Sequence, residues 1–413
     1  MPAVIFIAPF HLPVTMRFVY AVAALPNVRL GLISQEPIEK LAPDLRRRLA
    51  AYERVADALD VGHLEAGVKA VAKRLGGVDR LIGTLEQLQV QLGQLRDRLG
   101  IEGMGEEASR NFRDKARMKD VLQRAGVPCA RHRRITSAGE GWAFALDVGY
   151  PLILKPPDAA AAKGTFRVTD AETLHQALSA LRPSPERPAV AEEFVTGRER
   201  SFETVTIQGK PVWFSSTLYD PPPLHVLENP WIQWTVLMPR EEETEDTQLA
   251  RPHALAALQA LGMGTGLSHM EWFRRDRPGG PPVAISEVGA RPPGAQIVSL
   301  NSYAHGVDFY ERWARLVVFD QWDAPPRKFA AGVAFFRGQG KTRPGARVVA
   351  LHGVAEAQRE LGELVVDVKL PQIGQPRAES YEGEGYAILR HPDTDVVARA
   401  LRRLVSTVRV ELG

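Results

Sequence analysis

The first quarter of the chain alternates short apolar runs with helical patterns, and this alternation restricts the fold more than any other feature. Val4–Ala8 and Leu30–Ser34 have the length and composition of buried strands, and Thr15–Ala24 between them has a helical pattern. Leu41–Leu59 predicts a second helix, and Val78–Ile82 a further, weaker strand. Strands that alternate with helices are typical of a parallel sheet covered by helices. We therefore expect an α/β domain, and because no G-x-G-x-x-G motif follows the first strand, a dinucleotide site is not indicated.

The rest of the chain shows a different order of patterns, which predicts an α+β architecture. The helices expected here are Lys115–Ala125, Ala171–Leu181, His253–Leu261 and Val396–Val408, and the strands are Leu152–Lys155, Ala189–Phe194, Phe202–Gln208, Pro211–Ser215, Gly266–Phe273 and Val283–Glu287. Pro221–Trp234 is expected to be irregular, and the acidic run from Glu241 to Asp246 to be a solvated loop. The breaks between these groups predict four parts, with the bounds 1–108, 109–188, 189–328 and 329–413.

The composition excludes several classes of protein. Of the 413 residues, 45% are hydrophobic and 24% are charged, so a sizeable core is expected and disorder is not. A formal net charge of +3 argues against a dedicated nucleic-acid binder. Cys129 is the only cysteine, which excludes an intrachain disulfide and a multi-cysteine zinc site. No basic segment precedes the first apolar run, and no window approaches the roughly 18 apolar residues of a membrane span, so we expect a soluble, cytoplasmic protein.

Two lysines stand where a positive charge calls for an explanation. Lys155 ends the otherwise apolar strand Leu152–Lys155, and a lysine buried there must meet an anion or suffer a large desolvation penalty. From the strand alone, an anion site and a structural role remain equally open. Lys115 stands at the start of a predicted helix, within Arg113–Lys119, where a solvated surface charge is the simpler interpretation.

Two glutamates interrupt or end apolar strand patterns later in the chain. Glu271 belongs to the segment Ser268–Glu271, and Glu287 to the segment Ile285–Gly294. Two carboxylates on adjacent strands suit Mg²⁺, a hard ion that prefers oxygen ligands and phosphate oxygens, and Mn²⁺ is the alternative ion. Either glutamate alone would more often be structural.

Taken in order, the segments Arg113–Lys119, Gly149–Pro156, Ala191–Glu199 and Ser268–Gly294 resemble the ATP-grasp superfamily. The resemblance extends over essentially the whole chain, as an N-terminal parallel-sheet α/β domain, a two-subdomain ATP-grasp fold and a C-terminal α+β portion. Within the superfamily, Arg113–Lys119 and Gly289–Gly294 most resemble the bacterial L-amino-acid ligases and carnosine synthase. No single motif is specific, whereas the four motifs in this order and spacing are.

The resemblance implies a role for each matching residue. Lys115 and Lys155 match the lysines that hold ATP phosphates, and Glu271 and Glu287 match the Mg²⁺ ligands. Arg291 matches the arginine that stabilises charge on the acyl phosphate and on the tetrahedral intermediate, which is electrostatic catalysis. The remaining implied nucleotide contacts are the adenine-binding hinge, with Glu192, Glu193 and Val195, and the ribose-binding carboxylate, Glu199.

Two departures from the family pattern concern the metal and the phosphates. Gly289 stands where many members have an asparagine ligand, so we expect a second Mg²⁺ to be held less fully. The loop Asp158–Gly164, which would cover the phosphates, is rich in alanine, and only Gly164 adopts a positive φ freely. Lys163 in this loop is expected to supply a phosphate charge in compensation.

The resemblance implies an ATP-dependent carboxylate–amine ligase, which forms an amide or dipeptide through an acyl phosphate and releases ADP and phosphate. A carboxylase that activates bicarbonate and a nucleotide-binding protein without turnover are the alternatives. The expected partners are a small-molecule carboxylate and amine, without nucleic acid or membrane, and the candidate assembly is a homodimer. Tyr219–Trp234 is either the wall of a substrate pocket or an aromatic-anchored loop. The candidate pocket residues are His225, Glu228, Trp231 and His269.

Overall fold

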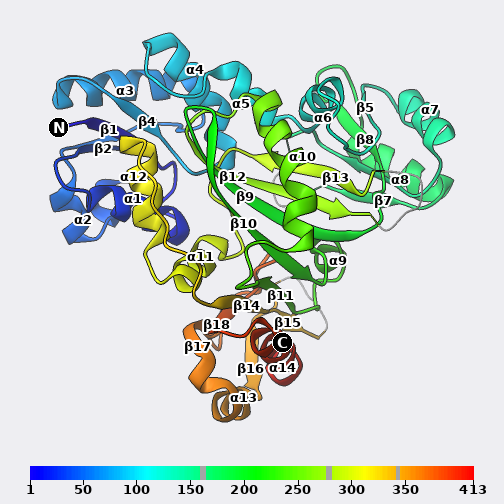
Figure 1. Ribbon diagram of the computed structural model, residues 1–413. Coiled ribbons are helices and arrows are strands. Elements are labelled where there is room, and N and C mark those ends of the chain that lie inside the picture. Colours follow the sequence, from blue (N-terminus) through cyan, green and yellow to red (C-terminus); the bar gives the residue numbers. More distant parts are fainter. Residues whose placement is uncertain (159–163, 276–280, 341–344) are drawn as a thin grey trace.

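The computed structural model describes residues 1–158, 164–275, 281–340 and 345–413, which form three lobes (Figure 1). The N-terminal lobe, in blue, also holds the yellow helix α12 (Phe309–Phe319), so the chain returns to it late. The cyan-green and green segments form the second lobe, and the orange and red C-terminal segment forms the third. Within the described ranges, no helix combines the length and the apolar character of a membrane span.

A four-stranded parallel sheet forms the centre of the N-terminal lobe, as the alternating pattern predicts. Its strands, in spatial order, are β3 (Ala51–Arg54), β2 (Arg29–Ser34), β1 (Ala3–Ile7) and β4 (Arg80–Ile82). The helices that cover it are α1 (Pro13–Ala23) and α12 on one face, and α3 (Val61–Leu75) and α4 (Gln89–Leu99) on the other. Val4 and Phe6 pack toward the first pair, and Ile5 and Ile7 toward the second. Burial on both faces explains why β1 is apolar throughout.

The predicted helix Leu41–Leu59 is confirmed only over the brief helix α2 (Pro43–Arg48), and strand β3 follows where the helix was expected to continue. A short 3-10 turn, η1 (Ile38–Lys40), precedes this segment. The edge of β2 accounts for the difference, because the N–H of Ala50 donates to the carbonyl of Leu30 at 2.8 Å and the following residues continue the parallel pairing. Pairing with an open sheet edge satisfies the backbone amides, and this tertiary effect outweighs the local helical pattern.

A four-stranded antiparallel sheet, called here the small sheet, lies at the outer end of the second lobe. In spatial order its strands are β5 (His132–Ile135), β8 (Ala189–Glu193), β6 (Leu152–Lys155) and β7 (Phe166–Val168). The helices around it are α7 (Ala138–Val148) and α8 (Ala171–Leu181), which share its core, and α5 (Glu106–Arg113) and α6 (Lys115–Arg124), which lead into it from the N-terminal lobe. The small sheet brings Lys155 and Glu192 onto neighbouring strands.

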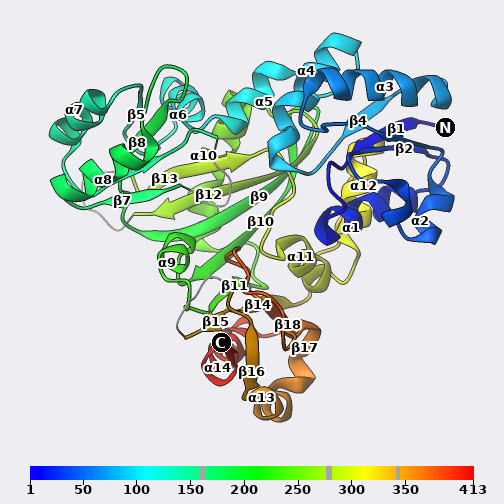
Figure 2. The same ribbon diagram turned by 180° about the vertical axis from the view of Figure 1, so that it is seen from behind.

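An eight-stranded sheet, called here the large sheet, joins the second lobe to the third. Its strands, in spatial order, are β13 (Val283–Gly289), β12 (Gly266–Arg274), β9 (Arg198–Ile207), β10 (Lys210–Asp220), β11 (Trp234–Met238), β14 (Ala330–Phe336), β18 (Gly385–His391) and β17 (Val365–Lys369). Helix α10 (Glu245–Leu261) packs against the outer face of β9, β12 and β13 and lies behind them in Figure 2. Because the sheet continues past residue 328, the second and third lobes share one hydrogen-bonded framework.

The acidic run is a loop only in its first part, Glu241–Glu243, because its last two residues open α10. Thr244 caps this helix, which begins at Glu245 and continues through Pro252. The carboxylate of Asp246 lies 3.1 Å from Arg200 and 2.5 Å from Arg274, both on the large sheet. These tertiary ion pairs hold the first turn in place, which the local sequence pattern does not reveal.

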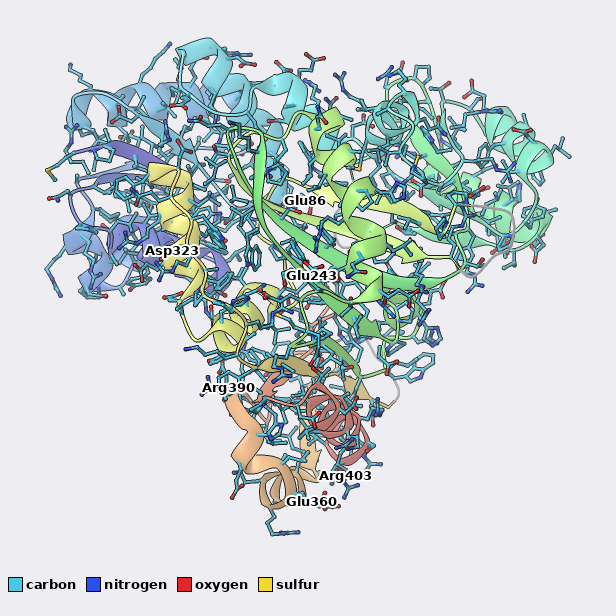
Figure 3. The ribbon with its side chains drawn as sticks, viewed as in Figure 1. Glu86, Glu243, Asp323, Glu360, Arg390 and Arg403 are labelled. Carbon is cyan, nitrogen blue, oxygen red and sulfur yellow. The ribbon has the colours of Figure 1, made fainter. Side chains whose placement is uncertain are left out.

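The third lobe adds a small three-stranded sheet to its share of the large one. Its strands in spatial order are β15 (Gly338–Gln339), β19 (Arg409–Leu412) and β16 (Val348–His352), and its helices are α13 (Val354–Leu361), η3 (Gly362–Leu364) and α14 (Thr394–Thr407). Helix α14 confirms the predicted final helix Val396–Val408. Arg403 and Glu360, labelled in Figure 3 at the tip of this lobe, form an exposed ion pair of 2.8 Å, a kind of contact that contributes little to stability.

Candidate functional site

A cavity of about 610 Å³ lies where the three lobes meet. Its wall combines the small sheet, the inner face of the large sheet, the N-terminal lobe and the loop Ser380–Glu382 of the third lobe. Along β9 and β12, Phe202, Met270 and Trp272 pack under α10. Because side chains alternate along a strand, Glu271 points to the opposite, inner face.

A buried chain of charges runs along one side of the cavity. Lys155 lies 3.0 Å from one carboxylate oxygen of Glu192, and Lys119 lies 3.4 Å from the other. Lys119 also donates to the carbonyl of Ser286 at 2.6 Å, which ties α6 to β13. Burial alone would raise the pKa of Glu192, but Lys119 and Lys155 outweigh it and hold that pKa below its usual value. The structure thus places Lys155 beside an anion, and the partner is a protein carboxylate.

Lys119 does not line the cavity itself but pairs with Glu192, which does, and sequence reasoning missed it although a signal exists. It is wholly buried, and burial lowers its pKa despite the nearby charge of Glu192. Its spacing of four residues from Lys115 puts both lysines on the same face of α6. Lys115 was already a candidate phosphate ligand. A second lysine on the same helix face is therefore the pattern that could have identified Lys119.

The two predicted metal ligands lie directly opposite each other. Glu271 on β12 and Glu287 on β13 are paired residues of the antiparallel ladder. Like charges at directly opposed positions repel, and a cation between them removes the repulsion. Lys115 supplies a positive charge 3.0 Å from Glu287. Burial alone would raise the pKa of Glu287, but Lys115 and Lys155 outweigh it and lower that pKa to about 2.

The donor set fits a Mg²⁺ ion bound together with nucleotide phosphates. Among the described residues, no group of three or more His, Cys, Asp or Glu side chains is arranged to hold a metal ion by itself. Mg²⁺ commonly uses one or two carboxylates and completes its shell with phosphate oxygens and water, which suits Glu271 and Glu287. Gly289 adds no ligand, and a Cβ built there would meet its neighbours only at 3.6 Å or more, so the position is open.

His269 links the metal ligands to a buried glutamate. Its Nδ1 lies 2.8 Å from Glu203 and its Nε2 lies 3.7 Å from Glu271. Burial alone would lower the pKa of His269, but its bonds to these two carboxylates outweigh it and raise that pKa to about 9. Glu203 is fully buried and was not predicted, because β9 carries several other charged and hydroxyl side chains, among which one more glutamate does not stand out.

The predicted adenine hinge, Glu192–Val195, begins in the last two residues of β8 and lines the cavity. Glu193 turns its carboxylate to Arg131 at 2.7 Å and to Arg275 at 3.2 Å. Its side chain is therefore engaged, which agrees with a backbone role for Glu193 and Val195. Glu199 also lines the cavity, and burial and the charge of Glu271 raise its pKa well above the usual value. The nucleotide roles of these residues stay predictions.

Arg291 meets the N-terminal lobe through a residue that the sequence did not point to. Its Nη2 and Nε lie 2.7 Å and 3.1 Å from Oε2 of Glu86, in the short turn η2 (Glu86–Leu88). Arg113 lies 3.3 Å from the other oxygen of the same carboxylate. Figure 3 places Glu86 at the centre of the molecule, between the N-terminal lobe and the large sheet. Glu86 therefore holds two arginines at the cavity wall.

The predicted irregular segment Pro221–Trp234 contains a helix, α9 (Pro223–Glu228), and Pro223 occupies a first-turn position, where its missing N–H is not needed. This helix presents Leu224 and Leu227 to the cavity. The predicted pocket residues His225, Glu228 and Trp231 are exposed and lie outside the cavity wall. Of the four candidates, His269 alone lines the cavity.

Of the predicted phosphate-covering loop Asp158–Gly164, only the two end residues are among the described residues. Lys163 lies outside the described residues, so its phosphate role stays a prediction. Gly164 has a φ of +70°, which confirms the expectation that this glycine supplies a left-handed position.

We expect Lys155→Ala to weaken nucleotide binding by more than about tenfold, because charge-assisted bonds to phosphate are worth roughly 1.5–3 kcal/mol each. The variant should also lose stability, since Glu192 keeps only Lys119; removing one partner of a buried ion pair typically costs about 3–5 kcal/mol. Calorimetry with ADP and urea unfolding measure the two effects. Lys210→Ala, at an exposed strand position, is the matched control. Unchanged ADP affinity in a folded Lys155→Ala variant would contradict the phosphate role.

The chain is similar to known proteins in both sequence and structure. Residues 120–305 match the family model described as the ATP-grasp domain. Over 132 residues the chain is 31% identical to the alanine–anticapsin ligase of Bacillus subtilis (strain 168), a match that covers 29% of this chain and 28% of that protein. The matched segment thus spans less than a third of the length of this curated relative.

Two solved structures share the architecture over nearly the whole chain. The L-amino acid ligase from Bacillus licheniformis has a TM-score of 0.76 at 18% identity, covering 99% of this chain and 98% of that one. The biotin carboxylase from Campylobacter jejuni has a TM-score of 0.67 at 14% identity, covering 99% and 92%. At these identities the likeness establishes the fold.

Proposed function

Because the chain carries an ATP-grasp domain, we propose that it is an ATP-dependent ligase that joins a carboxylate to an amine through an acyl phosphate. One observation carries the proposal: a single cavity is lined by Lys115 and Lys155, by the opposed pair Glu271 and Glu287, and by Arg291. Cations that hold phosphates and an arginine that faces an activated acyl group are the two requirements of this chemistry. The similarity to amino-acid ligases supports the same assignment.

The proposed reaction has two steps. A carboxylate oxygen of the substrate attacks the γ-phosphorus of ATP, the bond from phosphorus to the β,γ-bridging oxygen breaks, and ADP leaves. The amine nitrogen then bonds to the acyl carbon, the carbon–oxygen bond to phosphate breaks, and phosphate leaves. Lys115 and Lys155 would bind the phosphates, and Arg291 would stabilise the negative charge that develops on the acyl group. Glu271 and Glu287 would hold Mg²⁺, whose positive charge supports phosphoryl transfer.

The apolar part of the cavity separates this proposal from the carboxylase alternative. Leu12, Val14, Leu224 and Leu227 are apolar residues of the cavity wall. An acid as small as bicarbonate would leave this wall uncovered, whereas an acid with an apolar side chain would bury it. A nucleotide-binding protein without turnover would need neither this wall nor Arg291. We therefore favour the amide- or dipeptide-forming ligase.

Product analysis tests the proposed function. With ATP, Mg²⁺ and a mixture of the common L-amino acids, ³¹P NMR should show ADP and phosphate, and mass spectrometry should show dipeptides. AMP and pyrophosphate among the products would contradict the mechanism, because they require attack at the α-phosphorus. ADP release that depends on bicarbonate would favour the carboxylase, and nucleotide binding without any substrate-stimulated release would favour the non-catalytic alternative. The cytoplasmic location and the homodimer stay predictions.

A further inference from the structure

The carboxylates that line the cavity differ in whether their charge is compensated. Those with a cationic partner within 4 Å are Glu86, Glu192, Glu193, Glu271 and Glu287. Among the described residues, Glu199 and Glu382 line the cavity without such a partner. Glu199 stands at the predicted ribose position. Glu382 lies in a different corner, beside Gly294, three residues beyond Arg291.

The corner around Glu382 is built from backbone and aromatic groups. Its Oε1 accepts a hydrogen bond from the N–H of Ala295 at 3.0 Å. A Cβ built on Gly294 would lie 3.9 Å from that oxygen and 3.0 Å from the hydroxyl of Tyr381, so both side chains reach over this glycine. Ala295 and Gln296 have φ of 49° and 59°, a left-handed pair that leads into α11 (Ile297–His305). Strained backbone of this kind persists where the surrounding structure fixes it, often at functional sites.

The loop that carries Glu382 is held on both sides. Trp234 on β11 donates from its indole nitrogen to the carbonyl of Tyr381 at 2.7 Å, and the two rings pack edge to face at 5.5 Å. Glu384 accepts hydrogen bonds from the backbone of Gly338 at 2.7 Å and of Ala378 at 2.8 Å. These bonds leave the Glu382 carboxylate at a fixed place in the wall, as a substrate contact requires.

The charges around Glu382 leave it a good proton acceptor. Burial raises its pKa, and the bonds from Ala295 and Gln296, with the charges of Lys369 on β17 and Arg17 on α1, offset this only in part. The neighbouring acid is Tyr381, whose own pKa burial raises further. A carboxylate whose pKa lies nearer to neutrality is a more effective general base than an ordinary surface glutamate.

We propose that Glu382 binds the ammonium group of the amine substrate and accepts a proton from it. This inference rests on the ligase function proposed above. The ammonium group gives one proton to the Glu382 carboxylate, and the nitrogen lone pair that is released forms the bond to the acyl carbon. The carbon–oxygen bond to phosphate breaks, phosphate leaves with that electron pair, and the nitrogen loses its second proton to solvent. Glu382 and Arg291 line the same cavity, so the amine would lie between the Glu382 carboxylate and the acyl group beside Arg291.

The test compares two nucleophiles in the Glu382→Gln variant. The glutamine can still accept from Ala295, but it has no charge and is no base. Hydroxylamine is uncharged near neutral pH and needs no base, so hydroxamate formation from ATP and the common L-amino acids should proceed at the wild-type rate. Dipeptide formation from the same amino acids should fall on the order of 10²–10⁴-fold, the usual contribution of general acid–base catalysis. As the pH rises, a larger fraction of the amino acid carries an uncharged amine. The loss of dipeptide formation in the variant, relative to wild type, should therefore shrink by about tenfold per pH unit.

Two further variants separate this role from a structural one. Glu382→Asp keeps a carboxylate and should recover part of the dipeptide activity, which loss of packing would not allow. Glu379→Gln, at an exposed position of the same loop, should behave as wild type. Equal losses of hydroxamate and dipeptide in Glu382→Gln, or no loss of either, would overturn the proposal. A wild-type protein that forms no hydroxamate and releases no ADP with any acid would overturn the ligase function itself, and this inference with it.

Discussion

Glu287→Gln should abolish turnover while ADP still binds. The neutral amide cannot pair with Lys115, which lies 3.0 Å from the carboxylate, and is a much poorer Mg²⁺ ligand. The loss should exceed the roughly 10–100-fold that is typical of changes around a metal ligand, because Glu287 would be a direct ligand. The predicted contacts of the hinge with adenine and of the lysines with phosphate would survive, so ADP affinity measured by calorimetry should fall only modestly.

The design of that experiment uses two other glutamates. Glu271→Gln changes the residue directly opposite and should give a similar loss. Glu363→Gln, exposed on the third lobe, should leave activity unchanged. A Glu287→Gln enzyme that keeps full activity across a Mg²⁺ titration would remove Glu287 from the metal site.

Arg291→Ala should lower kcat by on the order of 10²–10³, the usual effect of removing one donor that stabilises an oxyanion, with ATP affinity near the wild-type value. The guanidinium is held by Glu86 at 2.7 Å and is partly buried, so its direction is fixed before substrate arrives. Glu86 keeps Arg113 as a partner in the variant, which limits the loss of stability.

Arg291→Lys is the matched control, because it keeps the charge and removes the planar two-point fork. It should recover only part of the rate. The measurements are steady-state ADP release and calorimetric nucleotide binding on the same preparations. A normal kcat in Arg291→Ala would show that this arginine does not act on the activated acyl group.

The sequence revealed those site residues that disturb a local pattern. Lys155 ends an apolar strand, and Glu271 and Glu287 interrupt two others, so each is visible without knowledge of the fold. Their opposition across β12 and β13 agrees with the expectation of adjacent strands. Lys163 and the nucleotide roles of the hinge stay predictions.

Other site residues acquire their meaning only from distant contacts. Glu86 and Arg291 are far apart in the chain, as are Lys119 and Glu192. No local pattern distinguishes Glu86 from an ordinary surface glutamate.

The two segments whose secondary structure was mispredicted, around β3 and at the start of α10, also depend on distant contacts. Strand β3 forms because an open sheet edge offers hydrogen bonds to a segment whose local pattern favours a helix. Helix α10 begins early because Asp246 finds two arginines on the large sheet. In both places a tertiary partner outweighs a local preference, which a single sequence does not display.

The cavity is walled by two separate sheets, and this division affects how the protein can open. In the described residues, one isolated backbone bridge, between Cys129 and Ile285, and side-chain bonds such as Lys119 to Ser286 cross the seam between them. Each sheet can loosen without breaking the ladder of the other. A nucleotide that contacts both sheets would hold them together. Part of its binding free energy would therefore appear as a higher free energy of local opening between the sheets. Trp234 belongs to the large sheet and the loop bonded to it leads directly into strand β18 of the same sheet, so the corner they form keeps its shape whether the seam is open or closed.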